Sequence, residues 1–311
     1  MRLLRGLYNI PSGFQGCVAT IGNFDGLHLG HQAVLAALSK ASEETGMPTL
    51  VMLFEPQPKE FFAPAQAPAR LASVREKLLD LQQAGVDYVL CLPFNQRLRS
   101  MTADAFIQHI LVDALKVQHL IVGDDFRFGC DRRGDFQALS AAGKIHRFEV
   151  EDTPTYEIDH TRVSSTRIRS ELSCAGLSAV NRLMGRPYRM NGRIITGRQL
   201  GRTLNTPTAN VRIDRRTLTM SGVFVVQARI EETGQVYQGV ANLGVKPSVA
   251  EQPEPSLEVH LLDYSGDVYG KHLDVVFLAR LREEKRFGSL DELTTAIEQD
   301  KSDARAWFAR G

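Results

Sequence analysis

The pattern of strands and helices expected from this chain changes near residue 185. Before that point, apolar strand-like runs alternate with segments of helical periodicity, and each helix is of ordinary length. The predicted strands cover 17–24, 49–54, 87–94 and 119–123, and the predicted helices cover 33–45, 73–84 and 102–115. This alternation predicts right-handed crossovers and a parallel sheet, an α/β fold that binds ligands beyond the carboxyl ends of its strands.

Beyond Met184 the strand-like segments follow one another without helices between them. They cover 222–230, 235–244, 257–263 and 271–279, with turn-forming clusters in the gaps. This pattern predicts an antiparallel barrel or sandwich, and only 289–308 has helical periodicity. We therefore expect a domain over residues 1–184 and a second, an antiparallel β-barrel with a C-terminal helix, over 185–311.

Composition limits the classes of protein to which the chain can belong. The 311 residues are 43% hydrophobic and 23% charged, which is typical of two folded domains, and the net charge is +1. No apolar run approaches the roughly 18 residues of a membrane span, and no excess of positive charge suggests a nucleic-acid partner. The start MRLLRG is interrupted too early to be a signal peptide, so we expect a cytoplasmic protein. The four cysteines lack metal-site spacing and are expected to be buried.

The string GNFDGLHLGH (22–31) joins the first predicted strand to the first predicted helix. Gly22, Gly26 and Gly30 allow a tight turn and a close approach of the backbone to a ligand, and a helix N-terminus favours anions. His28 and His31 can donate hydrogen bonds to phosphate oxygens at that place. A lone histidine there would more often be structural, but the complete string predicts a phosphate site.

Two further segments of the first half carry polar side chains suited to a ligand. RVSSTRIR (162–169) places hydroxyl residues at a predicted helix start beside arginines, which suits phosphate; a capped surface helix is the alternative. GDDFRFG (123–129) follows the fourth strand, where Asp124 and Asp125 either contact a ligand or form an Asx turn.

In the second half, GRIITGRQLGRTLNTPTAN (192–210) ends in a possible pair of hard metal ligands. Thr208 and Asn210 share a face if this segment is extended, although Pro and Asn are also common in turns. Strand alternation puts Glu258 and His260 on one face of 257–263, and we expect Glu258 to face into the barrel as a proton acceptor. The alternative for Glu258 is an exposed strand residue, and His260 is expected to be structural.

These strings, in this order, resemble the bacterial bifunctional riboflavin kinase/FAD synthetase family. The histidine string is similar to the H-x-G-H signature of nucleotidyltransferases, so the resemblance implies a Rossmann-like nucleotidyltransferase domain followed by a riboflavin kinase barrel. It implies catalytic roles for His28, His31 and Glu258, and nucleotide binding by Gly22, Asn23, Phe24, Gly26, Gly30, Arg162, Ser164, Ser165, Thr166 and Arg169. It implies flavin binding by Asp124, Asp125, Phe126, Phe128, Arg286 and Phe287, phosphate binding in the kinase by Gly197, Gly201, Arg202 and Ser248, and metal binding by Thr208 and Asn210.

The resemblance also implies a reaction sequence. Riboflavin would be phosphorylated by ATP to FMN, and FMN would then be adenylylated by a second ATP to FAD, with Mg²⁺ as the metal cofactor. The chain departs from the family's usual string at Asn205 and Thr206, which affects the kinase pocket but not the proposed metal ligands.

Two other functions compete with this one. A class I aminoacyl-tRNA synthetase has a related histidine signature, but this chain lacks a K-M-S-K-S-like loop and a basic stripe. A flavin or nucleotide carrier would bind without turnover. The expected partners are small molecules, with no nucleic acid and no membrane, and self-association is left open.

Overall fold

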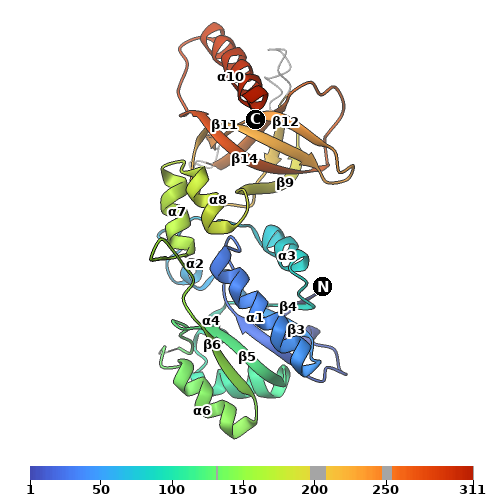
Figure 1. Cartoon of the computed structure of the whole chain (residues 1–311), viewed down its shortest axis with the longest axis vertical. Helices are drawn as coiled ribbons and strands as arrows, with labels where there is room; N and C mark the ends of the chain where they lie inside the picture. The colour runs from blue at the N-terminus through green and yellow to red at the C-terminus, as the bar shows by residue number, and fades with distance from the viewer. Residues whose placement is uncertain (131, 197–207, 247–253, 311) are drawn as a thin grey trace. The chain divides into compact units, whose positions relative to one another are not determined.

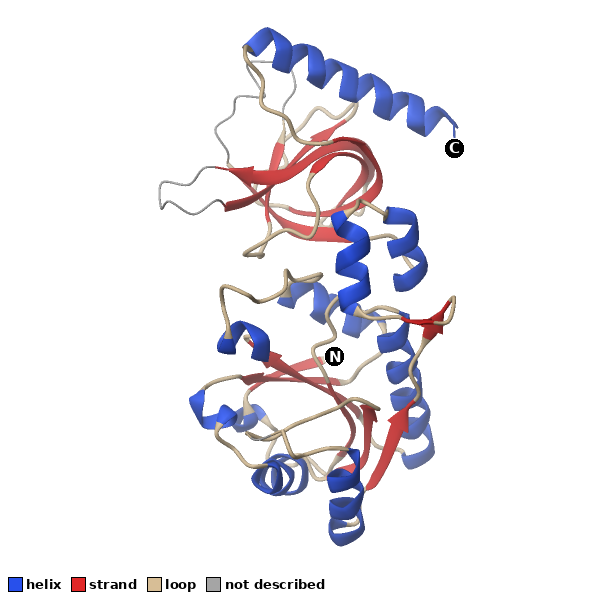
Figure 2. Cartoon of the chain, turned by 90° about the vertical axis from the view of Figure 1, so that its left-hand side faces the viewer, coloured by secondary structure: helices blue, strands red, loops and turns tan. Residues whose placement is uncertain are grey.

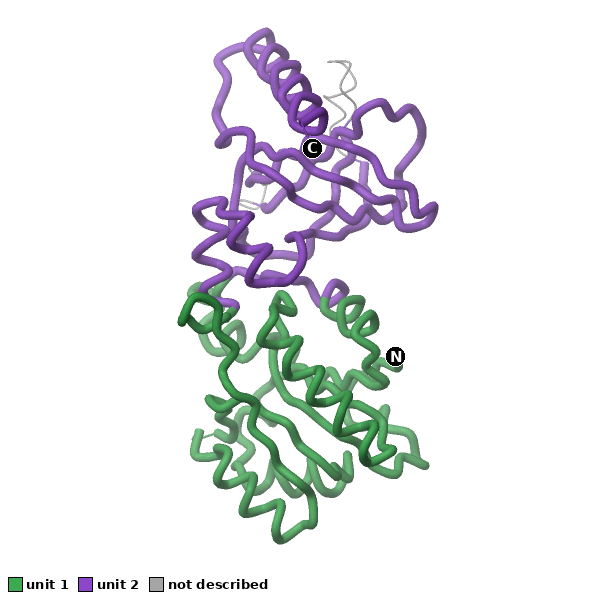
Figure 3. The backbone as a smooth tube through the Cα atoms, in the orientation of Figure 1, with its two compact units in different colours: residues 1–68, 77–164 green, residues 69–76, 165–311 purple. Residues whose placement is uncertain are grey.

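The structure, a computed structural model, describes residues 1–130, 132–196, 208–246 and 254–310. The chain forms two compact units (Figure 3). The first consists of Met1–Pro68 and Lys77–Ser164, and the second of Ala69–Glu76 and Ser165–Gly311. The domain boundary between residues 184 and 185 stays a prediction.

A six-stranded parallel sheet forms the centre of the first unit (Figure 1), as the alternating pattern predicts. Its strands run in the order β1-β4-β3-β2-β5-β6, and β7 pairs with β8 in a separate hairpin. The strands are β1 (Arg2–Arg5), β2 (Cys17–Ile21), β3 (Thr49–Glu55), β4 (Tyr88–Pro93), β5 (Val117–Gly123), β6 (Glu149–Thr153), β7 (Glu157–Ile158) and β8 (Thr161–Arg162). The helices are η1 (Leu7–Asn9), α1 (Leu29–Thr45), α2 (Pro58–Phe62), α3 (Val74–Gln83), α4 (Gln96–Arg99), α5 (Ala103–Phe106), η2 (Ile107–Ala114) and α6 (Phe136–His146).

Both faces of this sheet are covered, which is why its central strands are apolar on both sides. Leu35 and Leu38 of α1 and Leu81 of α3 pack on one face. Ile110 of η2 and Leu139 of α6 pack on the other. The layers are visible in Figures 1 and 2. The carboxyl end of β2 therefore opens directly into the loop that precedes α1.

A closed antiparallel barrel forms the centre of the second unit, so of the two architectures left open by the sequence it is the barrel that occurs (Figure 2). The strand order is β10-β13-β12-β11-β14-β9. The strands are β9 (Arg189–Ile195), β10 (Ala209–Arg212), β11 (Gly222–Ile230), β12 (Val236–Lys246), β13 (Glu254–Leu261) and β14 (His272–Arg282). The helices are α7 (Ser165–Ser173), α8 (Leu177–Met184) and α10 (Leu290–Arg310).

Helix α10 lies against the outside of the barrel wall. Its buried Ala304 packs with Val223, Val225 and Val240, which alternate along β11 and β12 with residues that fill the barrel interior. The barrel thus has apolar side chains on both faces of its wall where α10 covers it. This arrangement creates space for a site outside the barrel, under the helix.

Two expectations drawn from composition concern the cysteines and membrane-spanning helices. The expectation that all four cysteines are buried is wrong, because Cys130 and Cys174 are exposed and only Cys17 is fully buried. Burial raises the pKa of the Cys17 thiol to about 12. Among the helices in the described part of the chain, none combines the length and apolarity needed to cross a membrane.

Candidate active sites

The loop between β2 and α1 turns the chain within seven residues from the sheet to a helix N-terminus. The Gly22 amide still donates to the Met52 carbonyl of β3 at 3.1 Å, so the sheet ends there and the loop begins. Gly26 has φ 90°, which favours glycine, and Phe24 and Leu27 also adopt positive φ. The tight turn predicted for this string is therefore present.

The two histidines of the string stack on each other at the start of α1. Their ring centroids are 3.7 Å apart and their planes differ by 16°. Nδ1 of His28 accepts a hydrogen bond from the His31 amide at 3.3 Å, so His28 caps the helix and carries its ring proton on Nε2. A Cβ atom on Gly30 would lie 3.2 Å from the His28 ring, which explains the small residue between them.

His31 is held in its neutral form. Burial first, and then the nearby charges of His28 and Lys77, lower the pKa of His31 well below its ordinary value. Its Nδ1 atom is sealed from solvent and has no hydrogen-bond partner. The ring of His31 is therefore uncharged at the start of α1. Lys77, only 3% exposed, was missed by sequence analysis because it is one lysine in an unremarkable helical segment.

The loop after β5 brings together residues that the sequence predicts for flavin and nucleotide. Nη2 of Arg162 lies 2.8 Å from a carboxylate oxygen of Asp125 and 3.9 Å from one of Asp124. The Thr155 hydroxyl donates to Asp124 at 2.7 Å. The two carboxylates are thus partly neutralised by an arginine, which reduces the repulsion they would exert on a phosphate.

Phe126 and Phe128 stack with their centroids 5.5 Å apart. Phe128 is 7% exposed and belongs to the hydrophobic cluster with Phe106, whereas Phe126 is partly exposed. The predicted contact of these rings with flavin stays a prediction.

The predicted helix start at 164–166 is present, because α7 begins at Ser165. Arg162 and Ser164 belong to the first compact unit, while Ser165, Thr166 and Arg169 belong to the second. Nε of Arg169 donates to the Ala69 carbonyl at 2.6 Å. A nucleotide-binding role for these residues stays a prediction.

In the second unit, Glu258 does not face into the barrel, and this expectation is wrong. Leu257, Val259 and Leu261 fill the interior, so the alternating Glu258 lies on the outer face of β13. Its register partner on β12 is Asn242 and on β10 is Asn210. Alternation correctly separates the two faces of the strand, but it cannot tell which of them α10 covers.

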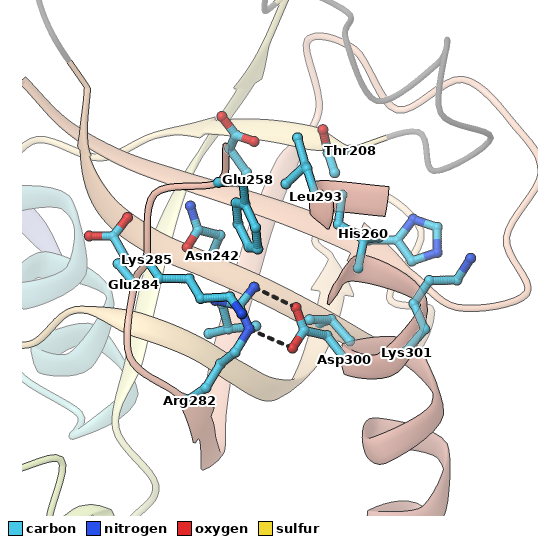
Figure 4. Close-up of a pocket in the computed structure, with 14 residues that line it drawn as sticks. Thr208, Asn242, Glu258, His260, Arg282, Glu284, Lys285, Leu293, Asp300 and Lys301 are labelled. Atoms are coloured by element: carbon cyan, nitrogen blue, oxygen red, sulfur yellow. Dashed lines mark hydrogen bonds and ion pairs between the residues drawn. The ribbon is translucent and has the colours of Figure 1, made fainter. Parts of the chain in front are cut away.

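A cavity of about 350 Å³ lies over this outer face. Figure 4 shows its polar lining, which includes Thr208, Asn242, Glu258, Arg282, Glu284 and Asp300. Arg282 binds Asp300 of α10 through two hydrogen bonds of 2.8 Å, which fixes the helix to the end of β14. Thr208 and Asn210 lie on this outer face too, because the alternating residues Ala209 and Val211 are buried.

Lys246, at the end of β12, joins Glu258 to Asn210. Its Nζ atom forms an ion pair with the Glu258 carboxylate and donates to Oδ1 of Asn210 at 3.1 Å. The base and one of the two metal ligands predicted from the sequence thus share one cation. Lys246 was missed because the contact depends on the register of three strands.

A second carboxylate, that of Glu284, enters the same cavity. Burial first, and the charge of Glu258 in addition, raise the pKa of Glu284, against hydrogen bonding from Asn242. A Cβ atom on Gly244 would overlap the Glu284 carboxylate, so a larger residue there would make that side chain move. The cavity is therefore lined by three carboxylates, those of Glu258, Glu284 and Asp300.

Phe287 lines the cavity, with the Arg282 guanidinium 5.6 Å and the Lys285 ammonium 5.0 Å from its ring centroid. Arg286 lines the neighbouring cavity on the other side of this segment, together with Phe287. Gly197, Gly201, Arg202, Asn205, Thr206 and Ser248 lie outside the described residues.

Comparison with known proteins identifies both halves of the chain. A family model for FAD synthetase matches residues 11–167, and one for riboflavin kinase matches residues 184–308. A bifunctional riboflavin kinase/FMN adenylyltransferase of Pseudomonas fluorescens is 54% identical over 99% of this chain and 98% of its own length. The chain belongs to this family. The relative of the same description in Escherichia coli K12 is 46% identical over the same shares of the two chains.

Among solved structures, one described as a macrolide-efflux protein from Streptococcus pneumoniae has the same fold. It superposes with a TM-score of 0.80 at 27% identity, covering 99% of this chain and all of the other. Family membership confirms the resemblance drawn from the motifs and leaves the aminoacyl-tRNA synthetase alternative without support.

Proposed function

We propose that the two activities of the family reside in separate sites of this chain. The α/β unit adenylylates FMN at the His28–His31 pair, and the barrel phosphorylates riboflavin at Glu258. The observation that carries this division is the position of Glu258 in a cavity of the barrel unit, next to Thr208 and bridged by Lys246 to Asn210.

In the kinase reaction, the ribityl 5′-hydroxyl of riboflavin attacks the γ-phosphate of ATP. Glu258 accepts the hydroxyl proton, the new O–P bond forms, and ADP leaves with the electrons of the broken bond. Phe287, with cations on its ring, and the apolar wall under α10 suit a flat flavin ring.

The residues present fit a magnesium ion. The Asn210 amide oxygen and the Glu258 carboxylate already share one cation, the Lys246 ammonium, and the Thr208 hydroxyl is of the same hard oxygen type. The described residues contain no group of three or more His, Cys, Asp or Glu that could hold a metal, so Mg²⁺ would take few protein ligands and rely on phosphate oxygens. Thr208 and Asn210 would hold it, and it would neutralise phosphate charge.

In the adenylylation, an oxygen of the FMN phosphate attacks the α-phosphate of ATP. Pyrophosphate leaves, and no strong base is needed because the attacking phosphate is already ionised. Nε2–H of His28 donates to the phosphate oxygens whose charge grows, and neutral His31 supports it in the stack. Arg162, Ser164, Ser165, Thr166 and Arg169 add donors for the nucleotide.

We place this enzyme in the cytoplasm, where its partners are riboflavin, FMN and ATP and not nucleic acid. Self-association stays open. A carrier without turnover is the competing function.

One incubation with riboflavin, ATP and Mg²⁺, followed by chromatography, tests the proposal. FMN, FAD, ADP and pyrophosphate are expected, and His28→Ala should accumulate FMN while Glu258→Ala leaves riboflavin unchanged. Equal loss of both steps in either variant contradicts separate sites, and a carrier would release no ADP.

A further inference from the structure

Four neighbouring strands of the barrel each contribute one residue to a row across the outer face of the wall. The register pairs Asn210 of β10 with Glu258 of β13. Glu258 is paired on its other side with Asn242 of β12, and Asn242 with Val223 of β11. Because paired strands lie about 4.8 Å apart, each side chain of this row is next to the one that follows it.

The two ends of the row differ in their chemistry. At one end, Asn210 accepts a hydrogen bond from Lys246 at 3.1 Å and is a proposed metal ligand. At the other end, Val223 belongs to the apolar cluster that contains Ala304 of α10. Metal and phosphate therefore suit the first end, and a flat apolar ring suits the second.

Riboflavin bound for phosphorylation has to follow this row. Its 5′-hydroxyl lies within hydrogen-bond reach of Glu258, and its ring lies in the apolar space beside Val223, under α10. The ribityl chain joins these two parts of the molecule, so it passes over Asn242. The 4′-hydroxyl, which is next to the reacting hydroxyl, is then the group that meets the Asn242 amide, since paired side chains start about 4.5–5.5 Å apart.

The Asn242 side chain is suited to a hydroxyl group. It lines the cavity together with Glu258 and Glu284 (Figure 4). The Glu284 carboxylate lies where a Cβ atom on Gly244 would stand, two residues along β12 on the same face as Asn242. Asn242 forms a hydrogen bond with Glu284, and an ionised carboxylate only accepts, so the amide nitrogen is turned to Glu284. The amide oxygen is then turned away from Glu284, where it can accept a proton from a hydroxyl.

We propose that Asn242 is a specificity-determining residue of riboflavin phosphorylation: its amide binds the 4′-hydroxyl of the ribityl chain and thereby places the 5′-hydroxyl at Glu258. The inference rests on the proposed kinase site. A flavin that lacks the 4′-hydroxyl leaves the amide facing a methylene group, and a site built to bind a hydroxyl discriminates strongly against such an analogue.

The test compares riboflavin with 4′-deoxyriboflavin and 2′-deoxyriboflavin as substrates of the full-length enzyme, by ADP release. Wild type should prefer riboflavin to the 4′-deoxy compound by about thirtyfold in kcat/KM. In Asn242→Leu, which keeps the approximate shape and lacks the amide, this preference should fall to about threefold or less, and Asn242→Ala should agree. The preference over 2′-deoxyriboflavin should not change. Gln238→Leu is the matched control, because Gln238 alternates to the same face of β12 but does not line the cavity.

The proposal is overturned if both Asn242 variants keep the wild-type preference, or if Gln238→Leu loses it as well. It is also overturned if the variants lose activity equally with riboflavin and 4′-deoxyriboflavin, which would mean that Asn242 serves ATP or the fold. Glu258→Gln is run in parallel. If it is inactive with every flavin while Asn242→Leu keeps its preference, the specificity proposal alone fails; if it phosphorylates riboflavin at the wild-type rate, the kinase site fails as well.

Discussion

The two candidate sites are encoded in different ways. The histidine site comes from one stretch of ten residues, 22–31, in which a strand end, a tight turn and a helix start follow one another. The cavity at Glu258 is lined by β11, β12, β13, the end of β14, the segment after it and α10, which only the fold brings together. A site formed by one continuous segment can be predicted from the sequence. A site formed by several distant segments requires the three-dimensional structure.

The sites also differ in their electrostatics, and the difference matches their proposed chemistry. His31 is neutral and stacked on His28, so this site can donate hydrogen bonds to charged phosphates. The barrel cavity is lined by Glu258 and Glu284, and Glu258 forms an ion pair with Lys246, so carboxylates and a cation meet there. In the proposed mechanism, the histidine site stabilises charge, and the barrel site also accepts a proton.

Among the variants that distinguish the two sites, Glu258→Gln is expected to have the largest effect. The amide cannot accept the hydroxyl proton, so riboflavin phosphorylation should fall about a thousandfold, measured as ADP release. FAD formation from supplied FMN should not change. The control is Glu283→Gln, a nearby carboxylate that does not line the cavity. A loss of less than about tenfold would remove Glu258 from the role of base.

His28→Asn should have the next largest effect. Asparagine is a good N-cap, so α1 keeps its start, but it does not reproduce the Nε2–H donor of His28. FAD formation from FMN should fall about a hundredfold, as for the loss of one donor to a developing charge. Pyrophosphate release measures it. If the variant keeps the wild-type rate, His28 serves only as a helix cap.

Lys246→Met is expected to have a smaller effect, on the kinase alone. Without the ammonium that joins them, Glu258 and Asn210 lose their shared partner, and phosphorylation should slow about tenfold because their relative placement is relaxed. Lys246→Arg should keep most of the rate. Equal rates in all three proteins would show that this cation is dispensable.

The smallest expected effect concerns stability and pH. The folded pKa of His31 is lower than its unfolded value near 6.5, so the unfolded chain binds the extra proton and stability falls as pH drops below 6.5. One proton contributes at most about 1.4 kcal/mol per pH unit to this slope. Urea unfolding between pH 7.5 and 5.5 should show a shallower slope for His31→Gln than for wild type, and identical slopes would contradict a neutral buried ring.

The parts of the fold that the sequence predicts are those with strong periodicity. The buried runs became β2, β3, β4 and β5, each within three residues of its predicted ends, because central strands of a parallel sheet are apolar on both faces. The edge strands β1 and β6 were not predicted, since RLLR and EVEDT are short and largely polar. The helix predicted over 102–115 is present but divided, with α-helical Ala103–Phe106 followed by a π-helical Ile107–Ala114.

Site prediction failed where it required long-range information. Glu258 was found but placed on the wrong side of the barrel wall, because alternation cannot show that α10 covers the outer face. Lys246 was missed because its role depends on contacts between strands distant in the chain. The proposed anion site is formed by one local segment and could be predicted from the sequence. Ion pairs between distant segments could not, because they depend on the fold.

The most direct test of separate sites is to mix the two defective enzymes. His28→Asn alone should convert riboflavin only to FMN, and Glu258→Gln alone should leave riboflavin unchanged. Their equimolar mixture, supplied with riboflavin, ATP and Mg²⁺, should form FAD, because FMN released by the first is adenylylated by the second. Failure of the mixture to form FAD, while Glu258→Gln still converts supplied FMN, would contradict two sites that work independently.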